Sequence, residues 1–109
     1  MRLRVDTDRP LPPSQQIVEA VLDAIAAGEL AFEARLPSVR EAAAMALVNP
    51  NTVARAWRDL EQLGVVEGRA GSGVFVTRAG PEIARRERRR ATLSAVRLAV
   101  EEEIGRAHV

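Results

Sequence analysis

The sequence predicts a mainly α-helical fold with one small β-hairpin. Helical periodicity recurs between residues 14 and 63, and the second and third of the expected helices are separated only by Leu47 and Val48. After Gly64 the pattern changes to β-branched and aromatic residues around a glycine-rich stretch. Two helices joined by so short a turn, followed at once by a hairpin, are typical of a winged helix-turn-helix domain. We expect this domain over residues 1–78 and a C-terminal helical segment over residues 79–109.

The first helix is expected to begin near Ser14. Residues 3–6 (LRVD) precede it and could form a short edge strand, and three prolines between residues 10 and 13 oppose a helix there. Ser14 is then a candidate N-cap, and Gly28 a natural stop. The apolar face has helical spacing and consists of Ile17, Val18, Val21, Leu22 and Ile25.

The second helix is expected to be short and to end at about residue 46. Ser38 and Glu41 form an S-x-x-E capping box, in which the serine side chain accepts from the Glu41 N–H and the glutamate reaches back. The segment before it, residues 29–37, ends in proline and is expected to be a connector.

The third helix is expected over residues 49–63, with Asn49 as N-cap and Pro50 in the first turn. At about 100° per residue, its apolar residues fall on one side of the helix axis. The opposite side carries Asn51, Arg55, Arg58 and Gln62. Such a face is either a solvated surface or a surface for nucleic acid.

A β-hairpin is expected next, with strands near residues 65–67 and 74–77. Residues 68–73 (GRAGSG) are expected to form its tip and to carry Arg69 among glycines, where a backbone can approach a phosphate closely.

A last helix is expected to start at Pro81. Its apolar residues are scattered loosely enough to suggest a helix that needs a partner surface, so self-association is plausible. Its arginine cluster, residues 85–90, is either a solvated face or a second phosphate contact.

The composition favours binding over catalysis. Of 109 residues none is Cys or Tyr, and the single His is His108, so a thiolate nucleophile or a His- or Cys-based metal site is not expected. We expect no cofactor, no signal peptide and no membrane span, hence a cytoplasmic protein. All 16 basic residues are arginine, which suits phosphate and guanine but also follows from a GC-rich codon bias.

Three segments together resemble the N-terminal winged-helix domain of the GntR family of bacterial transcription regulators. They are LPSVRE (36–41), NPNTVARAWRDLEQLGVVE (49–67) and GSGVFV (71–76). The N-P-N-T-V form, the opening LRVD and the short C-terminal segment resemble most the YtrA-type subfamily. The resemblance covers about residues 1–77.

The resemblance implies a homodimeric repressor that reads an inverted repeat in double-stranded DNA, with the third helix in the major groove. It implies DNA contacts at Arg40, Asn49, Asn51, Thr52 and Gly71. Helix N-termini suit phosphates, and Asn and Arg suit adenine and guanine. To these we add Arg55 and Arg58 from the helix face, and Arg69 from the wing. Arg58 could instead reach only the DNA backbone, or pair with Glu61 or Gln62.

Two alternatives remain open. The winged helix could serve protein–protein contact, in which case it shows no salt-sensitive duplex binding. The chain could also be the N-terminal part of a GntR-type fusion with an aminotransferase-like domain. No effector can be named from the sequence.

Two features depart from the family pattern. Leu47 stands where many members have glycine, and it would cost on the order of 1 kcal/mol in a left-handed conformation. Relatives of the YtrA type usually have two C-terminal helices, whereas this chain has room for one. Its end, EIGRAHV (103–109), is the peptide that a common sequencing adapter encodes, so we expect the natural chain to continue beyond about Glu102. The alternative is a polar terminus with Gly105 as the helix stop.

Overall fold

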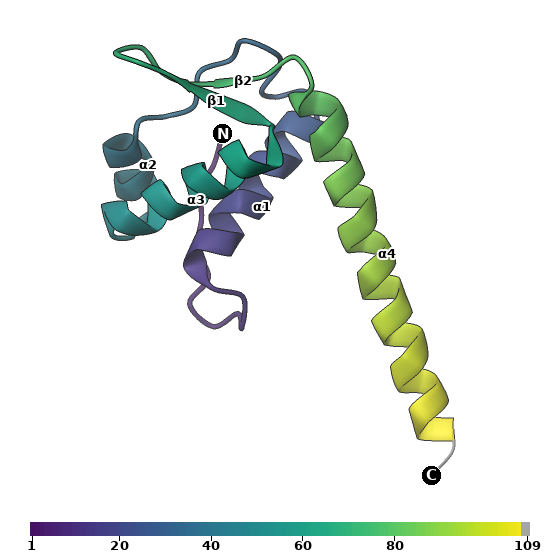
Figure 1. Cartoon of the computed structure of the whole chain (residues 1–109). Coiled ribbons are helices and arrows are strands. Elements are labelled where there is room, and N and C mark those ends of the chain that lie inside the picture. The colour runs from purple at the N-terminus through teal and green to yellow at the C-terminus, as the bar shows by residue number, and fades with distance from the viewer. Residues whose placement is uncertain (108–109) are drawn as a thin grey trace.

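The computed structural model describes the backbone of residues 1–107 and the side chains of residues 1–100. Its elements in chain order are α1 (Pro13–Ala26), α2 (Val39–Ala46), α3 (Pro50–Leu63), β1 (Val66–Arg69), β2 (Gly73–Val76) and α4 (Gly80–Ala107). The first three helices and the hairpin form one body, and α4 extends away from it (Figure 1). The predicted mainly α-helical fold with a winged helix-turn-helix arrangement is therefore confirmed.

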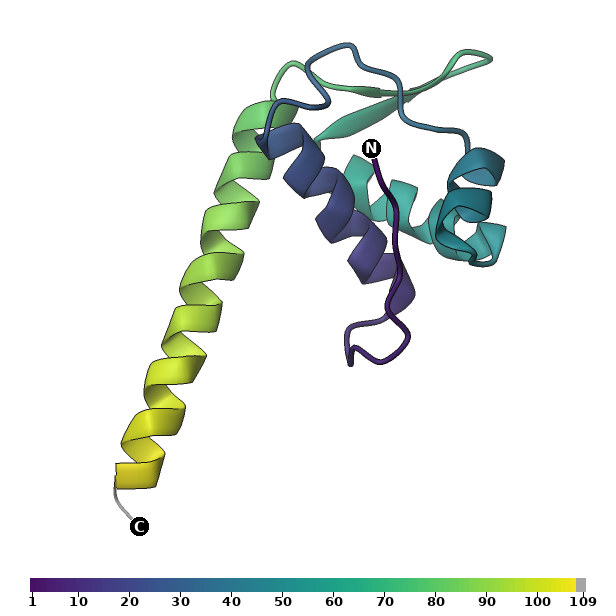
Figure 2. The ribbon, with the colours of Figure 1, turned by 180° about the vertical axis from the view of Figure 1, so that it is seen from behind.

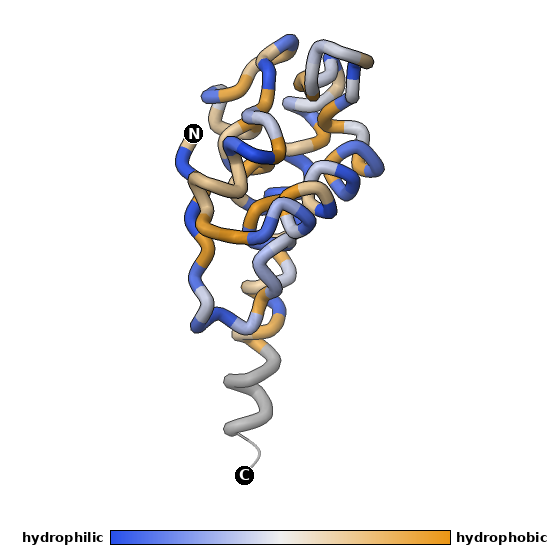
Figure 3. The backbone as a smooth tube through the Cα atoms, turned by 90° about the vertical axis from the view of Figure 1, so that its left-hand side faces the viewer, coloured by the Kyte–Doolittle hydropathy of each residue, from blue (hydrophilic) through white to orange (hydrophobic). Residues whose placement is uncertain are grey.

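The core lies where α1, α2 and α3 meet under the hairpin. Each helix contributes an apolar stripe, and the hairpin closes the core with Val66 and Val76. Short apolar runs alternate with hydrophilic residues along the body, as amphipathic helices require (Figure 3). The largest fully buried side chains are Ile17, Ile25, Leu36, Leu60, Val21, Val53, Val65 and Val76.

Side-chain caps fix where α2 and α3 begin. Ser38 Oγ accepts a hydrogen bond from the Glu41 N–H at 3.1 Å, and Asn49 Oδ1 accepts from the Asn51 N–H at 2.8 Å. These caps confirm both predicted starts. The capping box is only half formed, because no hydrogen bond between the Glu41 carboxylate and the Ser38 N–H occurs among the described residues.

Left-handed residues end the same two helices. Leu47 follows α2 with φ 55° and ψ 47°, and Gly64 follows α3 with φ 86°. Glycine adopts this conformation freely, whereas leucine is strained in it. The turn between α2 and α3 therefore contains a strained, exposed leucine.

The N-terminal expectations were wrong in two respects. The cap residue of α1 is Pro12 and the helix starts at Pro13, since proline is tolerated where its missing N–H would have no partner; Ser14 lies inside the helix and is buried. Residues 3–6 form no strand: this segment runs beside α1 and α2 with Leu3 in the core (Figure 2).

The hairpin extends closer to its tip than expected. Val66–Arg69 pairs antiparallel with Gly73–Val76, so Gly68, Arg69 and Gly73 belong to strands. The tip comprises only residues 70–72, and the expectation that Arg69 sits on it was wrong. Arg35 forms an antiparallel bridge to Phe75, which adds a short third segment beside β2.

Helix α4 begins at Gly80, one residue before the expected start. Ala84 is fully buried against the body, Arg88 pairs with Asp23 of α1 at 3.4 Å, and residues 88–100 are exposed. The helix continues through Gly105, so a stop at that residue is wrong. The side chains of residues 103–109, on which the expectation about the natural C-terminus falls, lie outside the described residues. Within the described chain, no helix combines the length and apolarity needed to cross a bilayer.

Candidate nucleic-acid interface

The exposed face of α3 carries the polar groups that the sequence placed there. Val53, Ala56, Trp57 and Leu60 are buried on the opposite side, and Trp57 Nε1 donates to the Pro37 carbonyl at 3.3 Å. This packing fixes the rotation of α3 about its axis. The solvent side therefore presents Asn51, Arg55 and Arg58, all exposed.

Four predicted contact residues line one surface hollow of about 460 Å³. They are Asn51, Thr52, Arg55 and Arg58, and the facing wall consists of Pro12, Pro13 and Ser14 from the start of α1. Two amide or hydroxyl groups and two guanidinium groups converge there. Among the described ion pairs none joins Arg58 to Glu61, whose carboxylate lies near Gly68 instead.

Arg40 and Asn49 lie at the starts of α2 and α3. Arg40 is the second residue of α2 and is exposed. The Oδ1 atom of Asn49 is used by the helix cap, which leaves its amide nitrogen able to donate to a ligand. Both side chains stand beside helix N-termini, where backbone dipoles favour an anion.

The hairpin tip, α2 and the start of α3 lie on the side of the body opposite α4 (Figure 1). Gly71 is at the tip with φ 75°, and a Cβ at this position would meet nothing within 4 Å. Its glycine is thus required by backbone conformation rather than by space. Gly71 is exposed, so the backbone of the tip is accessible to a ligand.

Arg69 is bound within the chain. Its Nη2 lies 2.7 Å from Glu33 Oε1 and 3.2 Å from Glu67 Oε1, and its guanidinium stacks on the Phe75 ring at 4.4 Å. The hydrogen bonds that Arg69 donates to Glu33, and secondly to Glu67, raise the pKa of Arg69 above its ordinary value. Of the eight predicted residues, Arg69 is the one already paired with carboxylates in the free chain.

The arginine cluster of α4 lies apart from this surface and is ion-paired. Arg85 and Arg89 face Glu82 at 3.5 and 3.7 Å, and Arg90 faces Glu87 at 3.3 Å. Such exposed pairs are typical of a solvated helix face.

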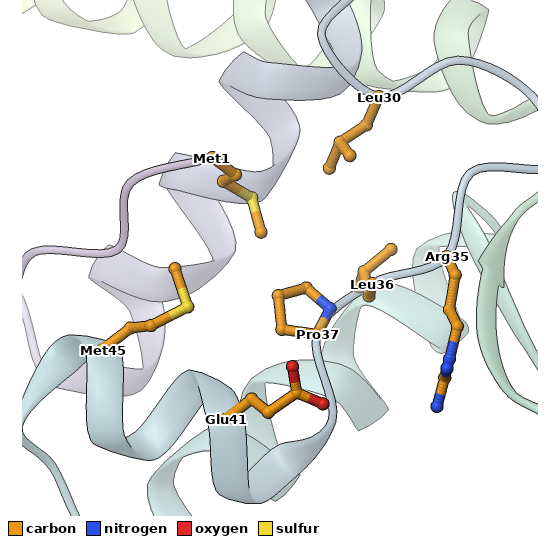
Figure 4. A pocket seen from close by; sticks show the side chains of 7 residues that line it. All are labelled: Met1, Leu30, Arg35, Leu36, Pro37, Glu41 and Met45. Carbon is orange, nitrogen blue, oxygen red and sulfur yellow. The ribbon is translucent and has the colours of Figure 1, made fainter.

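A second hollow, of about 370 Å³, lies between the N-terminus, α2 and the segment before it (Figure 4). Met1, Leu30 and Met45 point into it, with Glu41 at one side. No group of three or more metal-ligating side chains occurs in the described part of the chain.

Comparison with known proteins shows which family this chain resembles. Residues 13–76 match the model described as bacterial regulatory proteins, gntR family. The chain is 43% identical over 79 residues to the HTH-type transcriptional regulator Rv1152 of Mycobacterium tuberculosis, covering 72% of this chain and 65% of that protein. It is 32% identical over 75 residues to the HTH-type transcriptional repressor YtrA of Bacillus subtilis, covering 69% of this chain and 58% of YtrA. The chain thus spans less than two thirds of these curated relatives.

A solved structure with the same fold is the AraR DNA-binding domain in complex with operator ORX1. It superposes with a TM-score of 0.64 at 26% identity, over 71% of this chain and 99% of AraR's domain. The family match over residues 13–76 covers the three helices and the hairpin, and it includes all eight predicted contact residues. The chain therefore belongs to the gntR family of bacterial regulatory proteins, and within it to the YtrA-like members.

Proposed function

We propose that this chain is a transcriptional regulator that binds double-stranded DNA through α3 and the wing. The observation that carries the proposal is the surface formed by Asn51, Thr52, Arg55 and Arg58 on one face of α3. An α-helix fits the major groove of B-DNA, where asparagine pairs with adenine and arginine with guanine. The operator complex of the AraR domain, which shares this fold, supports the same use here.

The remaining contacts are proposed for the DNA backbone. Arg40, at the start of α2, and Asn49, at the start of α3, would each contact a phosphate. Gly71 offers its backbone at the wing tip. Arg69 contacts a phosphate once the phosphate has replaced the carboxylates of Glu33 and Glu67, an exchange that exposed ion pairs allow.

We further propose that the DNA-binding domain ends near residue 78 and that two copies of the chain associate through α4, which follows it. The free part of the helix exposes Leu93, Val96 and Val100 by 67%, 56% and 50%. Their spacing of three and four residues places them on one stripe, the pattern that pairs helices. A symmetric dimer presents two copies of α3 to an inverted repeat, and this arrangement suits a repressor that covers a promoter.

Selection of duplexes from a random pool tests the proposal. We expect enrichment of one inverted repeat whose half-sites are spaced by about one helical turn or a multiple of it. Affinity for the selected duplex should fall steeply with salt. Failure to enrich any sequence, together with no salt-sensitive duplex binding, would favour the alternative of a protein-binding module.

A further inference from the structure

The outer face of the wing carries a second arginine, Arg35, in addition to Arg69. Antiparallel partners project their side chains to the same face of a sheet, as do residues two apart along a strand. Arg69 is opposite Gly73, and Phe75 is two residues further along β2. Arg35 bridges to Phe75 from the other side of β2. Arg35 and Arg69 therefore flank β2 on one face, away from the core.

The Arg35 side chain lies against Gly73, where β2 has no side chain. A Cβ at Gly73 would be 2.8 Å from Arg35 Nε, and 3.5 Å from its Cζ and Nη2. The guanidinium thus occupies the space that any larger residue at this position would fill. Gly73 is the first residue of β2, directly after the tip residues 70–72, so this places the Arg35 charge beside the tip.

The two wing arginines differ in their partners. Arg69 is held by Glu33 and Glu67, whereas no ion pair in the described part of the chain involves Arg35. Arg35 is exposed and lies at the edge of the neighbouring hollow, which it lines together with Met1, Leu30 and Met45 (Figure 4). Its positive charge is therefore available to an anion without the loss of an ion pair described in the chain.

We propose that Arg35 is a phosphate-contacting residue of the wing, and that its seat against Gly73 positions it for this. The inference rests on the proposed DNA binding. The group that Arg35 would bind is a phosphodiester of the DNA backbone. The hairpin tip, α2 and the start of α3 lie on the same side of the body, so DNA bound by α3 would also pass beside the tip (Figure 1). A phosphate contact carries no sequence information, so Arg35 adds affinity for all duplexes alike.

The test compares Arg35→Gln, Arg35→Lys and Arg78→Gln in fluorescence anisotropy titrations over a range of salt concentrations. Arg78 is the matched control: like Arg35 it is an exposed arginine, but it stacks on Phe32 at 4.7 Å and follows β2 at the hairpin end remote from the tip. Each protein is titrated with the selected duplex and with a scrambled duplex. Thermal unfolding by circular dichroism shows whether each variant keeps the fold.

Arg35→Gln is expected to lose several-fold affinity for both duplexes equally. Its slope of log K against log salt should shrink by about 0.9 for each bound subunit. Arg35→Lys should keep most of the slope, because it keeps the charge, and Arg78→Gln should behave as the unaltered chain.

Two results would overturn the inference. If Arg35→Gln matches Arg78→Gln in affinity and slope while the unaltered chain binds DNA, Arg35 is a solvated arginine and the proposed function stands. If the unaltered chain binds neither duplex, both proposals fail together.

Discussion

Gln16 shows how one buried polar side chain organises the N-terminal segment. It is 4% exposed, its Nε2 donates to the carbonyls of Asp6 and Leu11 at 2.9 and 2.8 Å, and its Oε1 accepts from the Asp6 N–H at 2.8 Å. A buried amide is costly unless it is hydrogen-bonded, and this one has three partners. These hydrogen bonds fix the end of segment 3–6, which the sequence suggested as an edge strand, against the start of α1.

Replacing Gln16 with methionine should therefore destabilise the fold. Three backbone groups lose their partners while the side-chain volume changes little, so we expect a loss of about 2–3 kcal/mol in the free energy of unfolding. Urea denaturation measures it. The neighbouring Gln15→Met is the control because Gln15 is exposed, and equal stability of the two variants would contradict the role given to Gln16.

Leu47 is strained by its backbone and gains nothing from packing. Its φ is 55° and its side chain is 91% exposed. Leu47→Gly should raise the free energy of unfolding by about 0.5–1 kcal/mol, because relief of left-handed strain exceeds the entropic cost of glycine.

The control for Leu47 is Ala44→Gly, at an exposed position inside α2, which should lower stability by up to about 1 kcal/mol. Both variants are compared by their urea midpoints. A Leu47→Gly protein less stable than the unaltered chain would show that the exposed leucine makes a stabilising contact.

At the scale of elements, the sequence was sufficient where local interactions decide the structure. The two ends of α3 are fixed by residues close to them in the sequence: Asn49 and Pro50 at its start and Gly64 at its end. The ends of α3 and its exposed face could therefore be predicted. The same applies to the start of α2 at Ser38. The eight proposed contacts follow from these elements and from the family resemblance, and their roles in DNA binding stay predictions.

Elements that depend on distant residues were not predictable in the same way. The bridge of Arg35 to Phe75 and the ion pair of Arg69 with Glu33 join positions 40 and 36 residues apart. Nothing in the connector 29–37 indicated a strand-like segment, so Arg35 was missed. Spacing alone likewise could not show that Arg69 is paired in the free chain.

The proposed role of the exposed α3 face can be tested by two alanine substitutions. Asn51→Ala and Arg55→Ala should each weaken binding to the selected duplex by roughly 1–3 kcal/mol and relax specificity at one position. Anisotropy titrations against duplexes with single base changes measure both effects. Gln62→Ala is the control because Gln62 shares this face but lies in the last turn of α3, away from the hollow.

Unchanged affinity in both variants would remove α3 from the DNA interface. A loss as large in Gln62→Ala as in Arg55→Ala would also contradict the proposed placement, because it would move the contact towards the end of the helix remote from α2.

At the scale of the whole molecule, the chain consists of a packed body and a long projecting helix. The extents of 59 × 29 × 21 Å describe this shape, and α4 leaves the body after its first turns (Figure 2). An isolated helix exposing leucine and valine gains stability when those side chains are covered. A second copy of α4 is the partner we propose.

Glutamate in the α4 stripe should therefore separate the dimer. We expect the mass measured by light scattering to fall from two chains to one for Leu93→Glu and Val100→Glu, since a carboxylate would have to be buried at the contact. Leu98→Glu is the matched control: Leu98 is also exposed, at 62%, but lies off the stripe of Leu93, Val96 and Val100. Dissociation by Leu98→Glu alone would place the contact on another face of α4.

The central claim is that α3 and the wing, rather than α4, meet the DNA. An NMR titration of the isotope-labelled chain with the selected duplex tests it most directly. The account predicts that the backbone amides whose shifts change are those at the starts of α2 and α3 and around residues 70–73. Shift changes confined to the arginine cluster of α4, with the amides of Asn51 to Arg55 unaffected, would contradict it.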